Sequence, residues 1–221
     1  MQGSRKLCKV VLTSLLVFGF GQKCFADSVL YSNLGNGSDV YSSSSIGALG
    51  ISFSFVPTST AYFTELDIAL DAGYFTGDGV VDLGSDSATV ELMSDSAGSP
   101  GSALESWNVS GLPSFIGACC SLISLPGDGT ILLDSGTTYW VAAFAGDDEI
   151  WWNENATGAI QGLSSWTAGY GWTNYPLPYI GGALEVQGVS ATPEPGTLTL
   201  LGSGSLGLAG LMRRRLRRSA I

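Results

Sequence analysis

Two groups of acidic residues are the side chains in this sequence best suited to chemistry. Asp78, Asp82 and Asp86 lie four residues apart in the glycine-rich stretch GDGVVDLGSDS. Calcium binds carboxylate and backbone carbonyl oxygens at about 2.3–2.6 Å, so this stretch is a candidate calcium loop. Its spacing differs from the D-x-D-x-D-G pattern of an EF-hand, and the alternative is a solvated loop.

The second acidic group surrounds a pair of tryptophans. It consists of Asp147, Asp148, Glu149 and Glu154, which flank Trp151 and Trp152. Glycoside hydrolysis needs two carboxyl groups roughly 5–10 Å apart, and aromatic rings can stack on a sugar. A carboxylate-only glycosidase is therefore one hypothesis, and a solvated acidic turn between two strands is the other.

Aromatic residues are frequent in the later part of the chain. We take Trp151, Trp152 and Trp172 as candidate sugar contacts, since an exposed ring can pack against a sugar ring. The stretch GYGWTNYPLPY interleaves its rings with Gly and Pro, which predicts a surface loop. The alternative is that the rings cover the rim of the core.

Positive charge is confined to the two ends of the chain. Residues 24–212 contain no Lys, Arg or His, whereas all 19 Asp and Glu residues lie there. This excludes Ser-His-Asp and Cys-His catalysis, Schiff-base lysines and phosphate clamps. The negative charge also argues against a nucleic-acid partner. We therefore expect a protein that is not an enzyme, with no cofactor other than the calcium considered above.

The first 26 residues have the pattern of a secretory signal peptide. Arg5, Lys6 and Lys9 precede an apolar run over residues 10–20, and Cys24 and Ala26 place small residues three and one before a cut after Ala26. A retained anchor helix or a lipid-anchored Cys24 is the alternative. Lys23 interrupts the run before it reaches the length of about 18 residues that a membrane helix needs.

The last thirty residues combine a proline-rich stretch, an uncharged apolar segment and an arginine cluster. A helix over residues 196–212 would be about 25 Å long, close to the roughly 30 Å thickness of a hydrocarbon core. The arginines would hold its end on the cytoplasmic side, so the preceding domain faces outward. The predicted membrane anchor comprises Gly196, Leu200, Leu201, Leu206, Leu208, Leu211, Arg213, Arg214, Arg215, Arg217 and Arg218.

This order of Pro193, Glu194 and Pro195, then an apolar helix, then an arginine cluster resembles the PEP-CTERM sorting signal of Gram-negative bacteria. The resemblance implies that these three residues are recognised by an exosortase, a protease of the inner membrane. It further implies an inner-membrane intermediate that is released to the cell surface or the extracellular space. Two prolines keep the stretch extended, which suits binding of its backbone by a protease.

Between the two ends, residues 27–190 predict a single antiparallel β-sandwich of jelly-roll type. ISFSFV places Ile51, Phe53 and Phe55 on one face, and ATVELM places Val90 and Leu92 inward. AYFTELDIAL predicts one face of Tyr62, Thr64, Leu66, Ile68 and Leu70. SDSAGSPGS predicts a turn, ALESWNV a returning strand, and TILL, TTYWVAAFA, EIWW and ALEVQG further strands.

The run from TELDIALDAG through SDSAGSPGSALESW to LDSGTTYWVAAFA resembles the "choice-of-anchor" β-sandwich modules that precede anchoring signals. That resemblance supplies no catalytic residues. Taken together, the sequence predicts an exported, non-enzymatic protein of the cell surface or extracellular matrix, with extracellular polysaccharide as a candidate partner. A carbohydrate-binding module or a carboxylate-only glycosidase is the second hypothesis.

Overall fold

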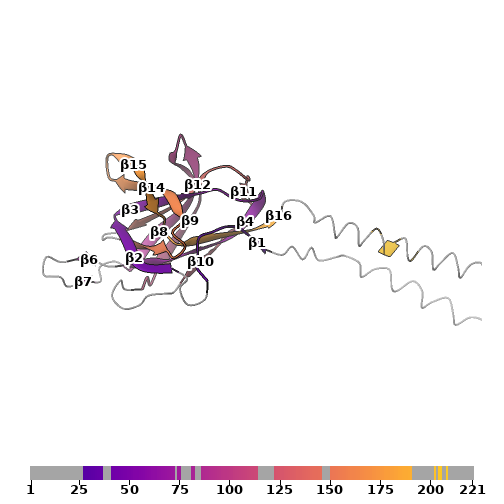
Figure 1. Ribbon diagram of the computed structural model, residues 1–221, viewed down its shortest axis with the longest axis horizontal. Coiled ribbons are helices and arrows are strands. Elements are labelled where there is room, and N and C mark those ends of the chain that lie inside the picture. Colours follow the sequence, from indigo (N-terminus) through magenta and orange to yellow (C-terminus); the bar gives the residue numbers. More distant parts are fainter. Residues whose placement is uncertain are drawn as a thin grey trace, which may run out of the picture.

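The computed structural model of the chain is an all-β fold (Figure 1). It describes residues 27–36, 41–72, 74–75, 81–82, 86–113, 122–145 and 150–190, together with residues 202, 204, 205 and 208. The strands are β1 (Asp27–Ser32), β2 (Tyr41–Ala48), β3 (Gly50–Phe55), β4 (Ala61–Ile68), β5 (Leu70–Ala72), β6 (Tyr74–Phe75), β7 (Val81–Asp82), β8 (Ser87–Ser96), β9 (Ser99–Ser110), β10 (Ile123–Pro126), β11 (Leu132–Leu133), β12 (Tyr139–Ala145), β13 (Ile150–Asn155), β14 (Ile160–Thr167), β15 (Gly171–Ile180) and β16 (Leu184–Ser190).

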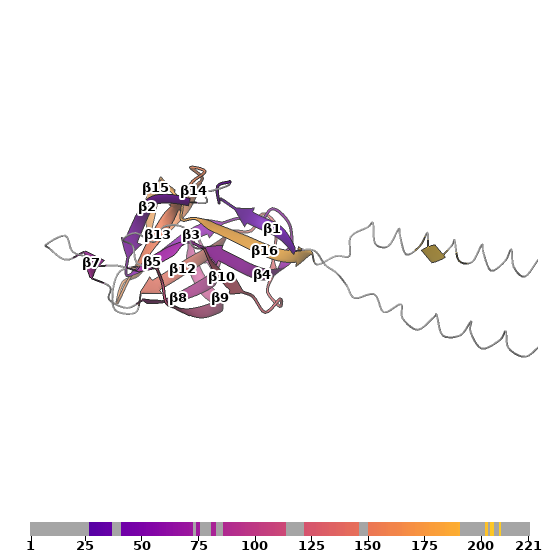
Figure 2. The same cartoon turned by 90° about the horizontal axis from the view of Figure 1, so that it is seen from below.

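The strands pair antiparallel throughout the described part of the chain. One sheet has the order β1-β16-β4-β10, with β11 also paired to β4, and a larger one has the order β15-β14-β3-β12-β8-β9. A three-stranded sheet β2-β13-β5 and a small β6-β7 pair complete the set. Figure 2 shows β1, β16 and β4 side by side. The predicted all-β class is thus confirmed.

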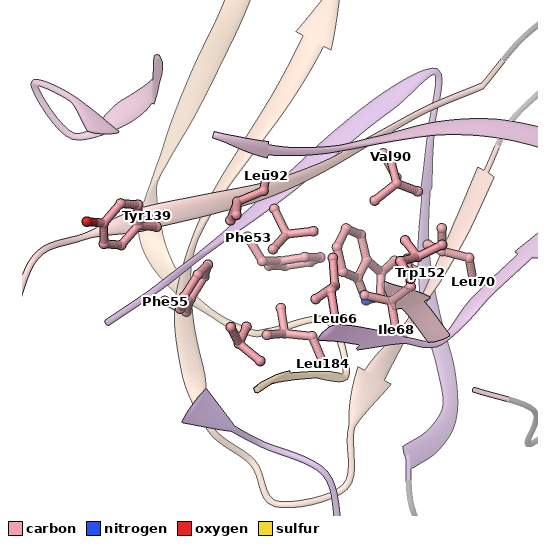
Figure 3. Packing of buried hydrophobic residues seen from close by; sticks show 14 of the residues in the cluster. Phe53, Phe55, Leu66, Ile68, Leu70, Val90, Leu92, Tyr139, Trp152 and Leu184 are labelled. Atoms are coloured by element: carbon pink, nitrogen blue, oxygen red, sulfur yellow. The ribbon is translucent and has the colours of Figure 1, made fainter. Parts of the chain in front are cut away.

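A single large core draws its side chains from both of the larger sheets. Phe53 of the six-stranded sheet and Leu66 and Leu184 of the five-stranded sheet belong to the same buried cluster (Figure 3). Trp152 of the three-stranded sheet meets Phe53 edge to face, with ring centroids 5.2 Å apart. Edge-to-face packing of this kind stabilises the pair beyond the contribution of the apolar area that both rings bury.

The strict alternation of the central strands is confirmed. Phe53 pairs with Val141, which in turn pairs with Leu92, and all three side chains are buried. The predicted turn after β8 is a two-residue hairpin at Ala97 and Gly98, whose φ angles are 54° and 83°. Two successive positive φ values match the right-handed twist of the flanking strands, which accounts for a glycine at the second position.

The predicted face of β4 is wrong in its first half. Tyr62 and Thr64 are not in the core, which instead contains Phe63. The register against β16 shifts between Glu65 and Phe63, which leaves Thr64 as an extra residue on β4. A β-bulge of this kind reverses which side chains face inward, so strict alternation cannot extend through it.

We expect Trp152→Ala to lower the free energy of unfolding by about 3–5 kcal/mol, because it empties a large volume in the core. Trp151→Ala is the matched control, since the neighbouring ring is only partly buried. Chemical denaturation measures both variants. Equal losses for the two would contradict the placement of Trp152.

Candidate functional site

An aromatic row crosses the outer face of the six-stranded sheet. The register places Phe144 opposite Gly50, and Trp166 opposite Trp172. Phe144 contacts both tryptophans, with ring centroids 5.8 Å from Trp166 and 5.4 Å from Trp172. A Cβ on Gly50 would come within 2.9 Å of the Trp166 Cβ and 3.1 Å of the Phe144 ring, so a glycine here lets the rings close over the strand.

Next to the aromatic row, the same face has a row of small residues. Ala142 pairs with Ser52, and Ser52 pairs with Ser164. All three are buried although they lie on the outer face of the sheet. Trp140, Met93 and Ala142 form a second apolar cluster there, against which Phe144 and Trp172 pack. The outer face therefore has aromatic side chains next to a row of small, buried side chains.

Side-chain hydrogen bonds link β15 to the turn between β8 and β9 at the opposite edge of this sheet. The Trp140 indole donates to Asp95 Oδ1 at 2.8 Å, and the Gly98 amide donates to Asp95 Oδ2 at 3.0 Å. Asn174 of β15 donates to the Gly98 carbonyl at 2.9 Å and to the Ser99 hydroxyl at 2.6 Å. Since β15 and β9 are opposite edge strands, these bonds show that the sheet curls around its outer face.

Only one of the three predicted sugar contacts lies in this row. Trp172 does, in a segment predicted as a loop that instead forms β15. Trp152 is 0 % exposed and donates its indole N–H to the Ala183 carbonyl at 3.1 Å, so its prediction as a surface contact is wrong. Trp151, one residue earlier, lies on a different sheet from Trp172. The alternating pattern of TTYWVAAFA, which places Phe144 on the same face as Trp140, is the signal that could have found the row.

The outer face of the five-stranded sheet bears a group of carboxylates around Gln187. The Gln187 amide donates to Asp67 Oδ2 at 3.2 Å, to Glu185 Oε1 at 3.2 Å and to Glu65 Oε1 at 3.5 Å. Burial raises the pKa of Glu65, and the negative charges of Asp67, Asp27 and Glu185 raise it further. In the described part of the chain no three acidic or cysteine side chains are close enough together to hold a metal ion.

The acids predicted from the sequence fall mostly outside the described residues. This applies to Asp78 of the calcium loop and to Asp147, Asp148 and Glu149 of the glycosidase hypothesis. Asp82 lies in β7, Asp86 is an exposed residue just before β8, and Glu154 forms a β-bridge with Gly182. The described residues bring none of these acids together as a pair.

Asp71 is a buried carboxylate with an oxygen that lacks a hydrogen-bond partner among the described residues, and Glu105 Oε2 is the other such oxygen there. Asp71 Oδ2 accepts a bond from Asn153 Nδ2 at 2.8 Å, while Asp71 Oδ1 accepts none. Burial raises the pKa of Asp71, and the bond from Asn153 only partly opposes this. Burying a charged oxygen without a partner is unfavourable, so Asp71 destabilises the fold when ionised.

The two ends of the described domain lie together. Asp27, at the start of β1, pairs with Val189, one residue before the end of β16. Residues 1–26 and Pro193, Glu194 and Pro195 lie outside the described residues, as do all predicted anchor residues except Leu208. Gly202, Gly204, Ser205 and Leu208 are helical and exposed. No helix within the described residues is long and apolar enough to cross a membrane.

Residues 191–218 match the PEP-CTERM protein-sorting motif. The match begins directly after the last residue of β16. It implies that the chain is processed by an exosortase and exported, with membrane-associated sorting to the cell surface. No curated protein matches the chain.

Asp71→Asn should remove a pH dependence of stability. Because the folded-state pKa is raised above 3.8, the folded protein retains a proton that the unfolded chain has released, and the free energy of unfolding falls as pH rises through that window. We expect the variant to melt higher than the wild type at pH 7 and to lose that advantage at pH 3. Asp134→Asn, on an exposed turn, is the control; identical shifts for both variants would contradict the assignment.

Proposed function

We propose that this chain is a non-enzymatic protein of the cell surface or extracellular matrix, made as a precursor with a signal peptide at residues 1–26 and a membrane helix at residues 196–212. The observation that carries the proposal is the sorting motif at residues 191–218, immediately after a folded body whose two ends lie together. Because both ends of the body lie together, the signal peptide and the C-terminal helix of the precursor can enter the same membrane side by side. The body is a β-sandwich module of the choice-of-anchor kind, supported by the one core shared between its larger sheets.

The charge distribution supports a non-enzymatic role. The body contains no Lys, Arg or His to act as a general base, clamp an anion or form an imine. Residues 27–190 contain 18 Asp and Glu residues and no Lys, Arg or His, and a net negative charge of this kind favours solubility of the exported body.

Processing at both ends is the direct test. In a host that supplies the sorting protease, intact mass of the exported protein should show that it begins at Asp27 and lacks the C-terminal arginines. Glu194→Ala should retain the C-terminal segment in the membrane fraction, because it removes the charge of the predicted recognition stretch. Thr199→Ser, inside the predicted helix, is the matched control. A Glu194→Ala protein processed like the wild type would contradict the proposal.

A second candidate function is binding of a neutral polysaccharide by the aromatic row. The specific observation in its favour is the grouping of the Phe144, Trp166 and Trp172 rings in the same sheet as Asn174, whose side chain bonds to the Ser99 and Ser164 hydroxyls. Aromatic rings with uncharged polar neighbours suit a ligand that has hydroxyl groups and no charge. The absence of cations from the body argues against an anionic polymer as the ligand.

Trp166→Ala and Trp172→Ala should each weaken binding of a neutral polysaccharide about two- to tenfold, since one ring contact is worth roughly 0.5–1.5 kcal/mol. Tyr62→Ala is the control, because Tyr62 lies on the five-stranded sheet. Affinity electrophoresis through gels containing the polysaccharide measures the effect. If the polysaccharide does not slow migration of the wild-type protein, or slows all variants equally, this second candidate is contradicted.

A further inference from the structure

The sorting motif lies very close to the folded body. β16 ends at Ser190, and Pro193 is three residues further along the chain. A fully extended chain spans at most about 3.3–3.6 Å per residue, so Pro193 lies within roughly 11 Å of the last strand. A protease of ordinary size that holds this stretch in its active site therefore contacts the end of the body, unless the strand unravels.

Unravelling of the last strand is disfavoured by its position. β16 is an inner strand, with β1 on one side and β4 on the other. Val189 pairs with both Asp27 and Tyr62, and Ser190 pairs with Ala61. Releasing these residues would break backbone pairing on two sides and uncover the buried Ala61, so the body stays folded up to the motif.

A row of side chains faces outward at this end, and we call it the exit row. It consists of Asp27, Val189, Tyr62 and Leu132, which are successive partners across β1, β16, β4 and β11. Tyr62 is 37 % exposed and Leu132 is 41 % exposed, so two large apolar side chains lie open beside the start of the motif. Both belong to the sheet whose last strand leads into the motif.

We propose that the exit row docks against the outer rim of the membrane protease that reads the sorting motif. This docking rests on the proposed function, and it gives the protease a second recognition surface, on the folded body. Apolar side chains at the centre of a small contact contribute most to its affinity, and the rim that meets Tyr62 and Leu132 is accordingly apolar. The body thereby positions the motif, and the protease distinguishes a folded substrate from an unfolded one.

Two changes to the full-length chain test this. A six-residue Gly-Ser spacer inserted after Ser190 separates the motif from the exit row and leaves the strands intact. Tyr62→Ser with Leu132→Ser removes the apolar contact. We expect each to slow processing about fivefold in a pulse-chase measurement, as expected for loss of a contact worth about 1 kcal/mol. Leu104→Ser is the matched control, since Leu104 is 39 % exposed on β9, which belongs to the six-stranded sheet.

The outcomes separate this inference from the proposed function. If Glu194→Ala is processed normally, the proposed function fails. If Glu194→Ala blocks processing but the spacer variant is cut as fast as the wild type or faster, only the docking inference is overturned. If the Tyr62→Ser, Leu132→Ser variant does not fold, the processing rate of the spacer variant alone tests the docking inference. Slower processing in cells with unchanged cleavage in detergent micelles, together with weaker vesicle binding, would assign the row to lipid and also overturn the inference.

Discussion

The position of β16 between β1 and β4 is the constraint on which the molecule's organisation depends. Leu184 and Val186 fill the core from this strand, and Gly188 lies where a Cβ would come within 2.7 Å of both the Leu30 side chain and the Tyr62 carbonyl. A glycine is thus needed where the bulge in β4 brings the backbones close. By pairing with β1 on one side, the strand also places the first residue of the body next to its last.

This arrangement links the fold to the sorting of the protein. The sorting motif begins directly after an inner strand, so the folded domain stays next to it. The same sheet bears the carboxylates around Gln187 on its outer face, whereas the other large sheet has its aromatic row on its outer face. The two outer faces therefore differ in chemistry: the acidic one adjoins the exit row, and on the aromatic one Asn174 bonds to the turn after β8.

Local patterning predicted the strands that alternate without interruption, because period-two burial is written directly in residues such as Ile51, Phe53 and Phe55. It failed where pairing between distant strands decides the outcome. The bulge at Thr64 arises from the register with β16, and Trp152 is in the core because β13 closes one end of it. The rings of β15 were predicted to lie in a loop, since Gly and Pro mask a strand that is held by its pairing with β14. Trp172 lies on an outer face, where Phe144 becomes its neighbour through register, and its role as a sugar contact stays a prediction.

Backbone hydrogen exchange along β16 in the folded full-length chain tests the central claim most directly. If β16 is paired on both sides up to the sorting motif, the amides from Val186 to Val189 should exchange as slowly as those of the inner strand β12. Fast exchange at Gly188 and Val189, with β12 still protected, would show that the strand opens before the motif and would contradict the account.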